Sequence, residues 1–389
     1  MPLEFTKLQK EHCCGCGACA QRCPKQCIIM IEDEKGFLYP SLNNNSCINC
    51  NLCIKVCPYS INHPNTQKQR NLSIYASQNQ NNHERKKSSS GGIFIALAKE
   101  IIAQKGIVFG AIFDQKWEVH QAMAINLEEV YPMMGSKYTQ SRIENSYILA
   151  EEMLKQGSKV LFTGTPCQIS GLKHFLLKEY TNLYTVSILC HGVPSPLIWR
   201  NYLTEISKGE KISYVNMRDK STGWSTSSMI IKNKKKIIIN EIGYRNYYRH
   251  GYTAHLYTRP SCYNCNMIDY SGSDLTIGDF WGVSKIIPEW NDDKGTSIVI
   301  IHSHKGNMLF QSTSLNSIPI TIEDARVGNG GFSHQLKSID NNFWNKYRIN
   351  NELLKTLDSY FHEPKVYRIY RDKIWRIKRY LKNIRMKIK

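Results

Sequence analysis

The sequence predicts an α/β domain built around a mixed sheet, preceded by a small cysteine-rich domain of α+β type. Three observations lead to this prediction. Ten of the fourteen cysteines lie between Cys13 and Cys57. Strand-like and helix-like segments alternate over residues 72–208, a pattern typical of a mostly parallel sheet whose faces are covered. Extended, β-branched segments follow over residues 212–241 and predict an antiparallel extension of that sheet.

Length and charge narrow the class of protein. The 389 residues suffice for two or three domains. The net charge is +19, but residues 365–389 hold eleven Lys and Arg against one acid, so the basicity belongs largely to the tail and does not indicate nucleic-acid binding. No apolar run approaches the roughly 18 residues of a spanning helix, and the N-terminus lacks the apolar core of a secretory signal. We therefore expect a cytoplasmic protein whose cysteines serve metal or redox chemistry.

Two cysteine runs in the first domain share the spacing C-x2-C-x2-C-x3-C-P, one ending at Pro24 and the other at Pro58. This spacing resembles that of bacterial ferredoxins with two cubane 4Fe–4S clusters, in which the fourth cysteine of each run binds the other cluster. The resemblance implies one cluster on Cys13, Cys16, Cys19 and Cys57, and a second on Cys23, Cys47, Cys50 and Cys53. Zinc also binds C-x2-C pairs, but two complete runs favour clusters. Cys14 and Cys27 fall outside both sets and are interpreted as small packing residues.

The remaining elements follow in order along the chain. Residues 72–77 predict a short strand, residues 78–90 a mobile loop, and the next helix runs from an N-cap at Ser90 to a stop at Gly106. Further strands are expected at 107–113, 159–164 and 183–189, helices at 141–157, 168–178 and 196–208, and antiparallel strands at 212–217, 227–233 and 235–241. We expect four regions: a two-cluster domain (1–62), a connector with a short strand (63–90), an α/β domain (91–340) and a basic tail (341–389).

Four cysteines remain in the α/β domain. Cys167 follows the strand at 159–164 and Cys190 follows the strand at 183–189, which places both at carboxyl ends of strands, where open α/β sheets bind ligands. Cys262 and Cys265 add a C-x2-C pair. Together the four predict a third 4Fe–4S cluster; the alternative is two buried thiols and an unrelated pair.

Six motifs appear in a fixed order: SSSGGIF, GSKYTQS, FTGTPCQISGL, LCHGVPSP, MRDKSTGW and RPSCYNCNMIDYSGSDLTIGDFWG. Over residues 10–335 the chain resembles the beta subunit of coenzyme F420-reducing hydrogenase, whose family includes formate dehydrogenase beta subunits and 7-hydroxymethyl chlorophyll a reductase. The resemblance implies an α/β flavoprotein domain that binds FAD beside an iron–sulfur cluster. It also implies that the SSSGG and GSKYTQS loops contact the flavin.

The flavin contacts implied by this resemblance are Ser90, Gly91, Gly92, Ser136, Lys137 and Thr165. Glycines at a helix start let backbone N–H groups approach a pyrophosphate, and Lys137 adds a cation. A Ser-Gly loop alone is more often a linker. His191 and Asp279 are candidate catalytic residues, although a single His is more often structural.

The expected function is that of an iron–sulfur flavoprotein oxidoreductase. Electrons would pass between 4Fe–4S clusters and FAD, to or from an unknown two-electron acceptor, with a redox partner protein or a small molecule as donor. The alternative is a non-catalytic electron-transfer subunit that serves a partner enzyme. A regulatory iron–sulfur protein that binds nucleic acid is the least supported reading, because the sequence shows no helix-turn-helix and no aromatic-basic platform.

The C-terminal tail has its own pattern. Apolar residues recur every three or four positions from Tyr367 to Ile388, with Lys and Arg between them, which predicts an amphipathic basic helix. Such a helix suits peripheral contact with an anionic membrane at its inner face, or an acidic partner. The other reading is an apolar stripe docked on the protein's own body.

Overall fold

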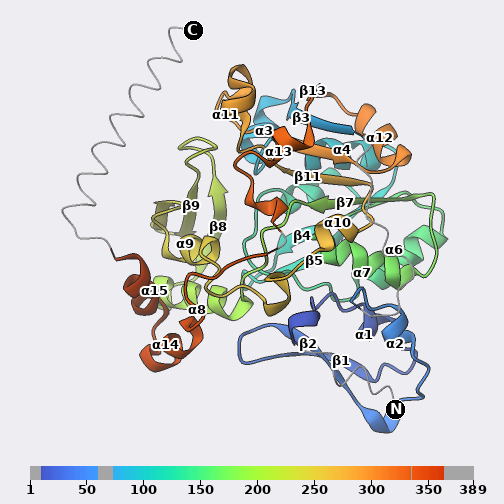
Figure 1. Cartoon of the computed structure of the whole chain (residues 1–389), viewed down its shortest axis with the longest axis horizontal. Coiled ribbons are helices and arrows are strands. Elements are labelled where there is room, and N and C mark those ends of the chain that lie inside the picture. The colour runs from blue at the N-terminus through green and yellow to red at the C-terminus, as the bar shows by residue number, and fades with distance from the viewer. Residues whose placement is uncertain (1–9, 60–72, 334, 363–389) are drawn as a thin grey trace. The chain divides into compact units, whose positions relative to one another are not determined.

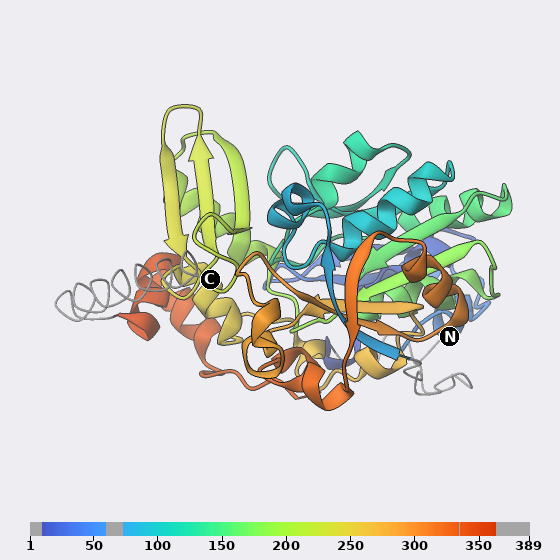
Figure 2. The same ribbon diagram turned by 90° about the horizontal axis from the view of Figure 1, so that it is seen from above.

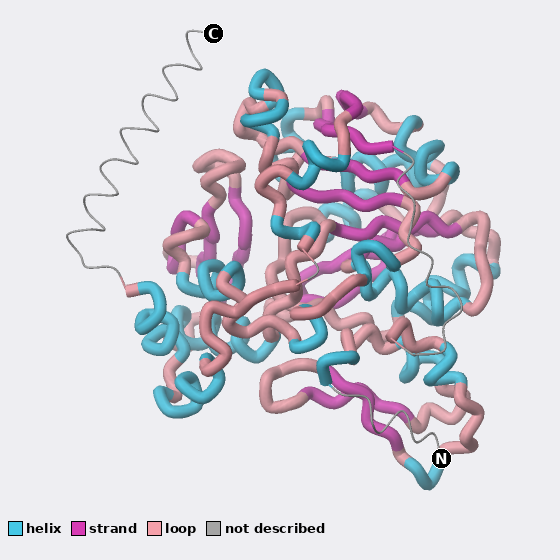
Figure 3. The backbone as a smooth tube through the Cα atoms, in the orientation of Figure 1, coloured by secondary structure: helices cyan, strands magenta, loops and turns pink. Residues whose placement is uncertain are grey.

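The computed structural model describes residues 10–59, 73–333 and 335–362. The chain forms two compact units, divided between Asn341 and Asn342. The first unit holds a two-stranded, a three-stranded and an eight-stranded sheet (Figures 1 and 3). In the described residues no helix is both long and apolar enough to cross a membrane.

The cysteine-rich segment contains two short helices and one antiparallel strand pair. These are α1 (Ala18–Arg22), α2 (Leu52–Lys55), β1 (Ile28–Glu32) and β2 (Leu38–Leu42), with 3-10 turns η1 (Lys10–His12) and η2 (Asn44–Ser46). Gly17 and Asn51, the N-caps of α1 and α2, both adopt left-handed backbone conformations, with φ of 70° and 58°. Gly and Asn are the residues that enter this region most readily. The chain can therefore reverse sharply inside each cysteine run and gather its thiols.

The eight-stranded sheet has the order β13-β3-β12-β11-β7-β6-β4-β5. Its strands are β3 (Ser73–Asn79), β4 (Ile107–Phe113), β5 (Val119–Ala124), β6 (Val160–Gly164), β7 (Leu183–Ile188), β11 (Leu275–Asp279), β12 (Ser297–Ile301) and β13 (Leu315–Pro319). The neighbours β4, β6, β7 and β11 are parallel, and every other pairing is antiparallel. The mixed sheet is confirmed, although it is less parallel than the alternation of elements predicted.

Helices cover both faces of this sheet. The main ones are α4 (Ile93–Ala103), α6 (Ser146–Lys155), α7 (Pro166–Leu176) and α12 (His304–Gln311). α4 and α12 bury one face, through side chains such as Leu97 and Phe310 packed with Leu161 of β6. α6 and α7 bury the other face, where Tyr147 and Phe175 pack with Phe162, and the cysteine-rich segment joins this same core through Cys16 and Ala18. Burial of both faces explains the continuous apolar runs in the central strands.

The segments predicted as an antiparallel extension are strands, but they form a separate sheet (Figure 2). This sheet consists of β8 (Ile212–Asp219), β9 (Ser228–Asn233) and β10 (Ile237–Ile242), and it follows α8 (Pro196–Ser207) and precedes α9 (Tyr247–Thr253). The prediction of an extension was wrong because β9 pairs with β8 on one side and β10 on the other, and none of the three pairs with a described strand of the larger sheet.

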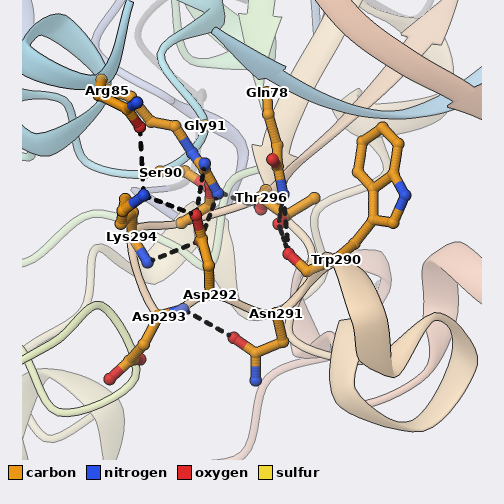
Figure 4. A network of polar contacts seen from close by, with 12 residues as sticks. Gln78, Arg85, Ser90, Gly91, Trp290, Asn291, Asp292, Asp293, Lys294 and Thr296 are labelled. Atoms are coloured by element: carbon orange, nitrogen blue, oxygen red, sulfur yellow. Dashed lines mark hydrogen bonds and ion pairs between the residues drawn. The ribbon is translucent and has the colours of Figure 1, made fainter. Parts of the chain in front are cut away.

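The expected mobile loop at 78–90 was also wrong, because it contains helix α3 (Asn82–Lys87). The side chain of Asn81 caps this helix by accepting from the N–H groups of His83 and Glu84. Arg85 is buried and forms a bidentate ion pair with Asp292, at 2.9 and 2.7 Å (Figure 4). This tertiary pair fixes a segment whose composition alone is typical of a loop.

The remaining short elements connect these layers. They are α5 (Leu127–Val130), α10 (Met267–Tyr270), α11 (Val283–Ile286), α13 (Ile322–Arg326), and the 3-10 turns η3 (Tyr131–Met133), η4 (Pro260–Cys262), η5 (Pro288–Trp290) and η6 (Gly330–Phe332). The second unit contains α14 (Phe343–Asn350) and α15 (Leu353–Phe361), whose rings Phe343 and Tyr360 lie 6.2 Å apart. The predicted amphipathic helix of the tail lies outside the described residues.

Candidate iron-sulfur and flavin site

The first predicted cluster set is brought together in the structure. Cys19 lies beside Cys13 and Cys57: burial raises the pKa of its thiol, and the two neighbouring sulfurs add to the rise. Cys16 is likewise within electrostatic reach of Cys19 and Cys57. Burial and the neighbouring sulfurs both disfavour the thiolate form of these cysteines. Bound iron would offset both effects, because its positive charge stabilises the thiolate.

The second set lines a single hollow. Cys23, Cys47, Cys50 and Cys53 all face it, together with Ile28, Leu42 and Leu52. Cys27, which was interpreted as a packing residue, is buried at the edge of the same hollow with its Sγ 3.3 Å from that of Cys23. This hydrogen bond with Cys23, with burial, raises the pKa of Cys27 to about 11. The hollow therefore holds five thiols, of which four have the ferredoxin spacing.

The third set comes from three elements of the α/β domain. Cys167 lies in the first turn of α7, directly after β6, and Cys190 follows β7, which is the parallel neighbour of β6. η4 supplies Cys262, and Cys265 follows it. Burial raises the pKa of Cys262 to about 12, and the charges of Cys167 and Cys265 contribute. Burial also raises the pKa of Cys190, with contributions from the other three thiols. The structure thus gathers all four.

Cys14 joins the first and third sets. It is buried in the core cluster that contains Ile169 and Leu172 of α7, and its thiol interacts with those of Cys16 and Cys167. The interaction with Cys16 and burial raise the pKa of Cys14 well above its ordinary range, although the interaction with Cys167 opposes this. Sequence reasoning missed this contact, because no local spacing connects Cys14 to Cys167.

No group of three or more His, Cys, Asp or Glu side chains in residues 10–59, 73–333 and 335–362 converges tightly enough to hold a single metal ion. A single zinc ion needs its ligand atoms within about 2.3 Å of one point. A cubane instead spreads its thiolates over the corners of a cube, so this finding concerns single-ion sites.

The cysteine-rich segment is fixed on the α/β domain by polar contacts. The side chain of Gln21 accepts from the N–H groups of Tyr147 and Ile148 at the start of α6. Glu32 forms an ion pair with Arg200 of α8. The hydroxyl of Tyr59 donates to the Cys265 sulfur at 3.7 Å. The three predicted cluster sets therefore lie in the same compact unit of the chain.

The SSSGG loop lies between α3 and α4 and is held by the residues that lead into β12 (Figure 4). The hydroxyl of Ser90 donates to the Thr296 carbonyl at 2.8 Å, and the Gly91 N–H donates to the Ser297 hydroxyl at 2.9 Å. A Cβ on Gly91 would lie 2.4 Å from the Ser77 carbonyl oxygen, so this position requires glycine. The N–H that was expected to approach a pyrophosphate thus has an internal acceptor. Gly92 has a φ of 85° and caps α4.

Two lysines flank this loop. Lys137 donates to the carbonyls of Met133, Met134 and Gly135 at 3.1 to 3.3 Å, and Ser136 donates to the Ser89 hydroxyl at 2.9 Å. Lys220 donates to the carbonyls of Arg85, Ser90 and Lys294 at 2.6 to 2.8 Å. Burial lowers the pKa of each lysine to about 7, helped at Lys220 by Arg218 and Arg85. Lys220 was not predicted as a site residue, although it lies in the MRDKSTGW motif.

Asp279, a candidate catalytic residue, pairs with a buried arginine. Its carboxylate accepts from Arg218 Nη1 at 2.5 Å and from Trp224 Nε1 at 3.0 Å. Arg218 lies over the Trp281 ring at 4.8 Å, and Trp281 stacks on Trp224. Within the described residues Arg218 Nε makes no hydrogen bond. Asp279 is thus the counterion of Arg218.

His191, the second catalytic candidate, stacks on His255 with ring centroids 4.7 Å apart. Burial lowers the pKa of both imidazoles, to about 4 for His255. Both rings are therefore neutral at pH 7, and their contacts are those of packed side chains.

The GSKYTQS loop, which the family resemblance connects with flavin, contacts an aromatic residue near the third cysteine set. Tyr138 of the GSKYTQS loop stacks on Tyr252 with centroids 5.1 Å apart. Tyr252 is partly buried and lies within electrostatic reach of Cys190 and Cys262. Thr165, the N-cap of α7, places its hydroxyl 3.2 Å from the Cys167 sulfur.

Two family models match the chain. Residues 12–61 match the 4Fe-4S dicluster domain, and residues 157–325 match the C terminus of the coenzyme F420 hydrogenase/dehydrogenase beta subunit. These matches confirm the family resemblance. The beta-subunit match begins before α7 and contains all four cysteines of the third set.

Relatives with curated descriptions cover parts of the chain. A coenzyme F420-dependent sulfite reductase of Methanocaldococcus jannaschii is 26% identical over 215 residues, which are 53% of this chain and 32% of that protein. An uncharacterized ferredoxin of the same organism is 39% identical over 51 residues, 13% of this chain and 65% of the ferredoxin. The chain thus spans about a third of the reductase's length.

One solved structure is also similar. It is described as a xenon derivatization of the F420-reducing [NiFe] hydrogenase complex from Methanosarcina barkeri. The identity is 19%, the alignment covers 67% of this chain and 85% of that chain, and the TM-score is 0.45. A likeness at this level carries no functional conclusion.

Proposed function

We propose that this protein is an iron–sulfur flavoprotein oxidoreductase that passes electrons between 4Fe–4S clusters and FAD, to or from a two-electron acceptor. The observation that carries the proposal is the contact between Tyr138 and Tyr252, because it joins a loop assigned to flavin to the third cysteine set. When bound, cubane clusters supply one-electron transfer and FAD links it to two-electron chemistry, so the two groups must lie close together.

The chain offers three neighbouring groups of thiols for clusters. Cys53 of the second set is within electrostatic reach of Cys19 in the first, and Cys14 contacts both Cys16 and Cys167. The three sets therefore follow one another from the exposed Cys50 to the α/β domain. Every proposed ligand is a sulfur, which is the donor that iron–sulfur clusters require.

The charges near the SSSGG loop fit the pyrophosphate of FAD. Lys137 and Lys220 donate only to carbonyl oxygens, and the described residues place no carboxylate within ion-pair distance of either. Both lysines are partly buried, and a cation removed from water without a counterion is costly, so an anionic ligand would stabilise both. We assign flavin binding to Ser90, Gly91, Gly92, Ser136, Lys137 and Thr165, and add Lys220. Because the Gly91 N–H has an internal acceptor, we expect the lysines to carry most of the phosphate contact.

The descriptions of the relatives support a proposal for the redox partner and the electron acceptor. The matching family model describes a beta subunit, and the similar reductase is described as dependent on coenzyme F420, so we propose a redox partner protein and an organic two-electron acceptor resembling a deazaflavin. The second candidate is an electron-transfer subunit without an active site of its own, which the dicluster match alone would satisfy.

Anaerobic purification with quantification of iron, sulfide and flavin tests the proposal. We expect about twelve irons, four for each cubane, and one FAD released on denaturation. Turnover of the isolated protein with an artificial donor and a deazaflavin acceptor should accompany the flavin. Clusters without flavin, and without turnover, would instead support the electron-transfer subunit.

A further inference from the structure

Arg259 is fully buried between the cysteine-rich segment and the α/β domain. It directly precedes η4, the turn that carries Cys262. Its guanidinium donates from Nε to the Cys13 carbonyl at 2.7 Å and from Nη2 to the Leu38 carbonyl at 3.0 Å, and Nη2 also lies 3.8 Å from the Cys13 sulfur. Nη1 donates to the Gln140 side chain at 2.9 Å. One side chain thus binds the first cluster loop while its backbone supports the third set.

The surroundings hold this guanidinium in one position. It lies over the Tyr39 ring at 4.4 Å. Gly15, with a φ of 69°, also packs against it, since a Cβ there would come within 2.8 Å of Nη1. Gln140, which accepts from Nη1, donates in turn to the Cys14 carbonyl at 2.9 Å. Replacing Arg259 would therefore remove hydrogen bonds and packing contacts that hold residues 13–15 in place.

The charge of Arg259 lacks a carboxylate partner among the described residues. Its hydrogen-bond acceptors are two carbonyls, an amide oxygen and one cysteine sulfur. A guanidinium removed from water without an anion is strongly unfavourable. The sulfurs of Cys13 and Cys262, both proposed cluster ligands, lie within electrostatic reach of the guanidinium. As thiolates, the form in which cysteine binds a metal, they would supply the missing negative charge.

We propose that Arg259 is the shared counterion of the first and third cysteine sets and raises the reduction potential of the cluster that Cys13 binds. This rests on the cluster ligation proposed above. Reduction adds negative charge to a cluster, and a cation or an N–H donor at its sulfur stabilises that charge. Arg259 supplies both at Cys13. It is a positioning and tuning residue, because it reaches the cluster only through a ligand.

The test is an EPR-monitored redox titration of anaerobically purified full-length protein, with iron content measured on each sample. Arg259→Gln removes the charge, and Arg259→Lys keeps the charge but loses the planar fork. We expect Arg259→Gln to retain wild-type iron and to lower the midpoint potential of one cluster by at least 59 mV, a tenfold change in a one-electron equilibrium. Arg259→Lys should shift it less.

Arg200→Gln is the matched control. Arg200 pairs with Glu32 across the same boundary but contacts no cysteine in the described structure, so its loss should leave all potentials unchanged. Equal potentials in Arg259→Gln and wild type at full iron would overturn the inference, as would equal shifts in the Gln and Lys variants. Loss of iron from both variants would also overturn it and leave Arg259 a purely structural role. A wild-type protein without clusters would instead defeat the proposed function itself.

Discussion

The thiols of Cys14 and Cys167 interact: Cys14 raises the pKa of Cys167, and Cys167 in turn lowers that of Cys14, so the first ferredoxin loop and the first turn of α7 meet at two sulfurs. Cys14 stands outside the ferredoxin spacing, whereas Cys167 is one of four cysteines gathered in the α/β domain. The contact places a non-ligand thiol between two proposed clusters. Replacing Cys14 therefore tests whether a cysteine that lies near the clusters is also needed to bind them.

We expect Cys14→Ala and Cys27→Ala to retain about twelve irons per chain, and Cys190→Ala to lose about four. Ala fills most of the space of a buried thiol, whereas a missing ligand leaves one cube incomplete. Iron and sulfide analysis after anaerobic reconstitution measures the difference. About eight irons in wild type, unchanged in Cys190→Ala, would rule out the third cluster.

FAD affinity should weaken as the pH rises above about 7. In flavin-free protein Lys137 and Lys220 each have a pKa of about 7, so each loses its charge near this pH. An anionic pyrophosphate binds the protonated form and raises the pKa, so binding takes up protons and becomes weaker at higher pH. Flavin fluorescence titrations between pH 6 and 9 measure this.

Lys137→Gln and Lys220→Gln should each lower FAD affinity and flatten the pH dependence, with iron content unchanged. Lys294→Gln is the control, because Lys294 lies nearby but pairs with Asp292 at 3.2 Å. An unaltered pH profile in both test variants would refute phosphate binding by these lysines.

Asp279→Asn should destabilise the fold by about 3 kcal/mol, because it leaves the buried Arg218 without its counterion. Denaturant unfolding measures the loss of stability. The control is Asp219→Asn, because Asp219 follows Arg218 at the end of β8 and little effect on stability is expected. Wild-type stability combined with abolished turnover would instead make Asp279 catalytic.

Deletion of residues 365–389 should abolish sedimentation of the protein with vesicles that contain anionic lipid. The basis is the basic amphipathic pattern of the sequence there. Neutral vesicles are the control. If the full chain does not sediment, or the truncated chain still does, the membrane role of the tail is excluded.

The parts of the fold and site that could be predicted depend on local spacing. The cysteine runs constrain their own loops, and Cys167 and Cys190 could be paired because each follows a strand of the alternating pattern. The strands at 107–113 and 183–188 were predicted almost to the residue because their apolar runs are buried on both faces.

The parts that were missed depend on contacts between distant segments. The composition of residues 78–90 predicts a loop, because nothing local shows that Arg85 pairs with Asp292 and so fixes a capped helix there. Arg259 meets Cys13, and Lys220 meets the carbonyl of Ser90, only after the sheet has formed. Such pairings have no periodicity in the sequence, and tertiary packing decides them.

Gly171 of α7 lies one turn after Cys167 and faces the first ferredoxin loop. A Cβ there would come within 2.9 Å of both Cβ and Sγ of Cys16 and of the Tyr147 hydroxyl. The close approach of the first ferredoxin loop to α7 therefore requires glycine at position 171. A chimera that carries the ferredoxin domain of another protein would therefore also need an α7 with glycine at this position. We expect the ferredoxin domain to be exchangeable only together with α7.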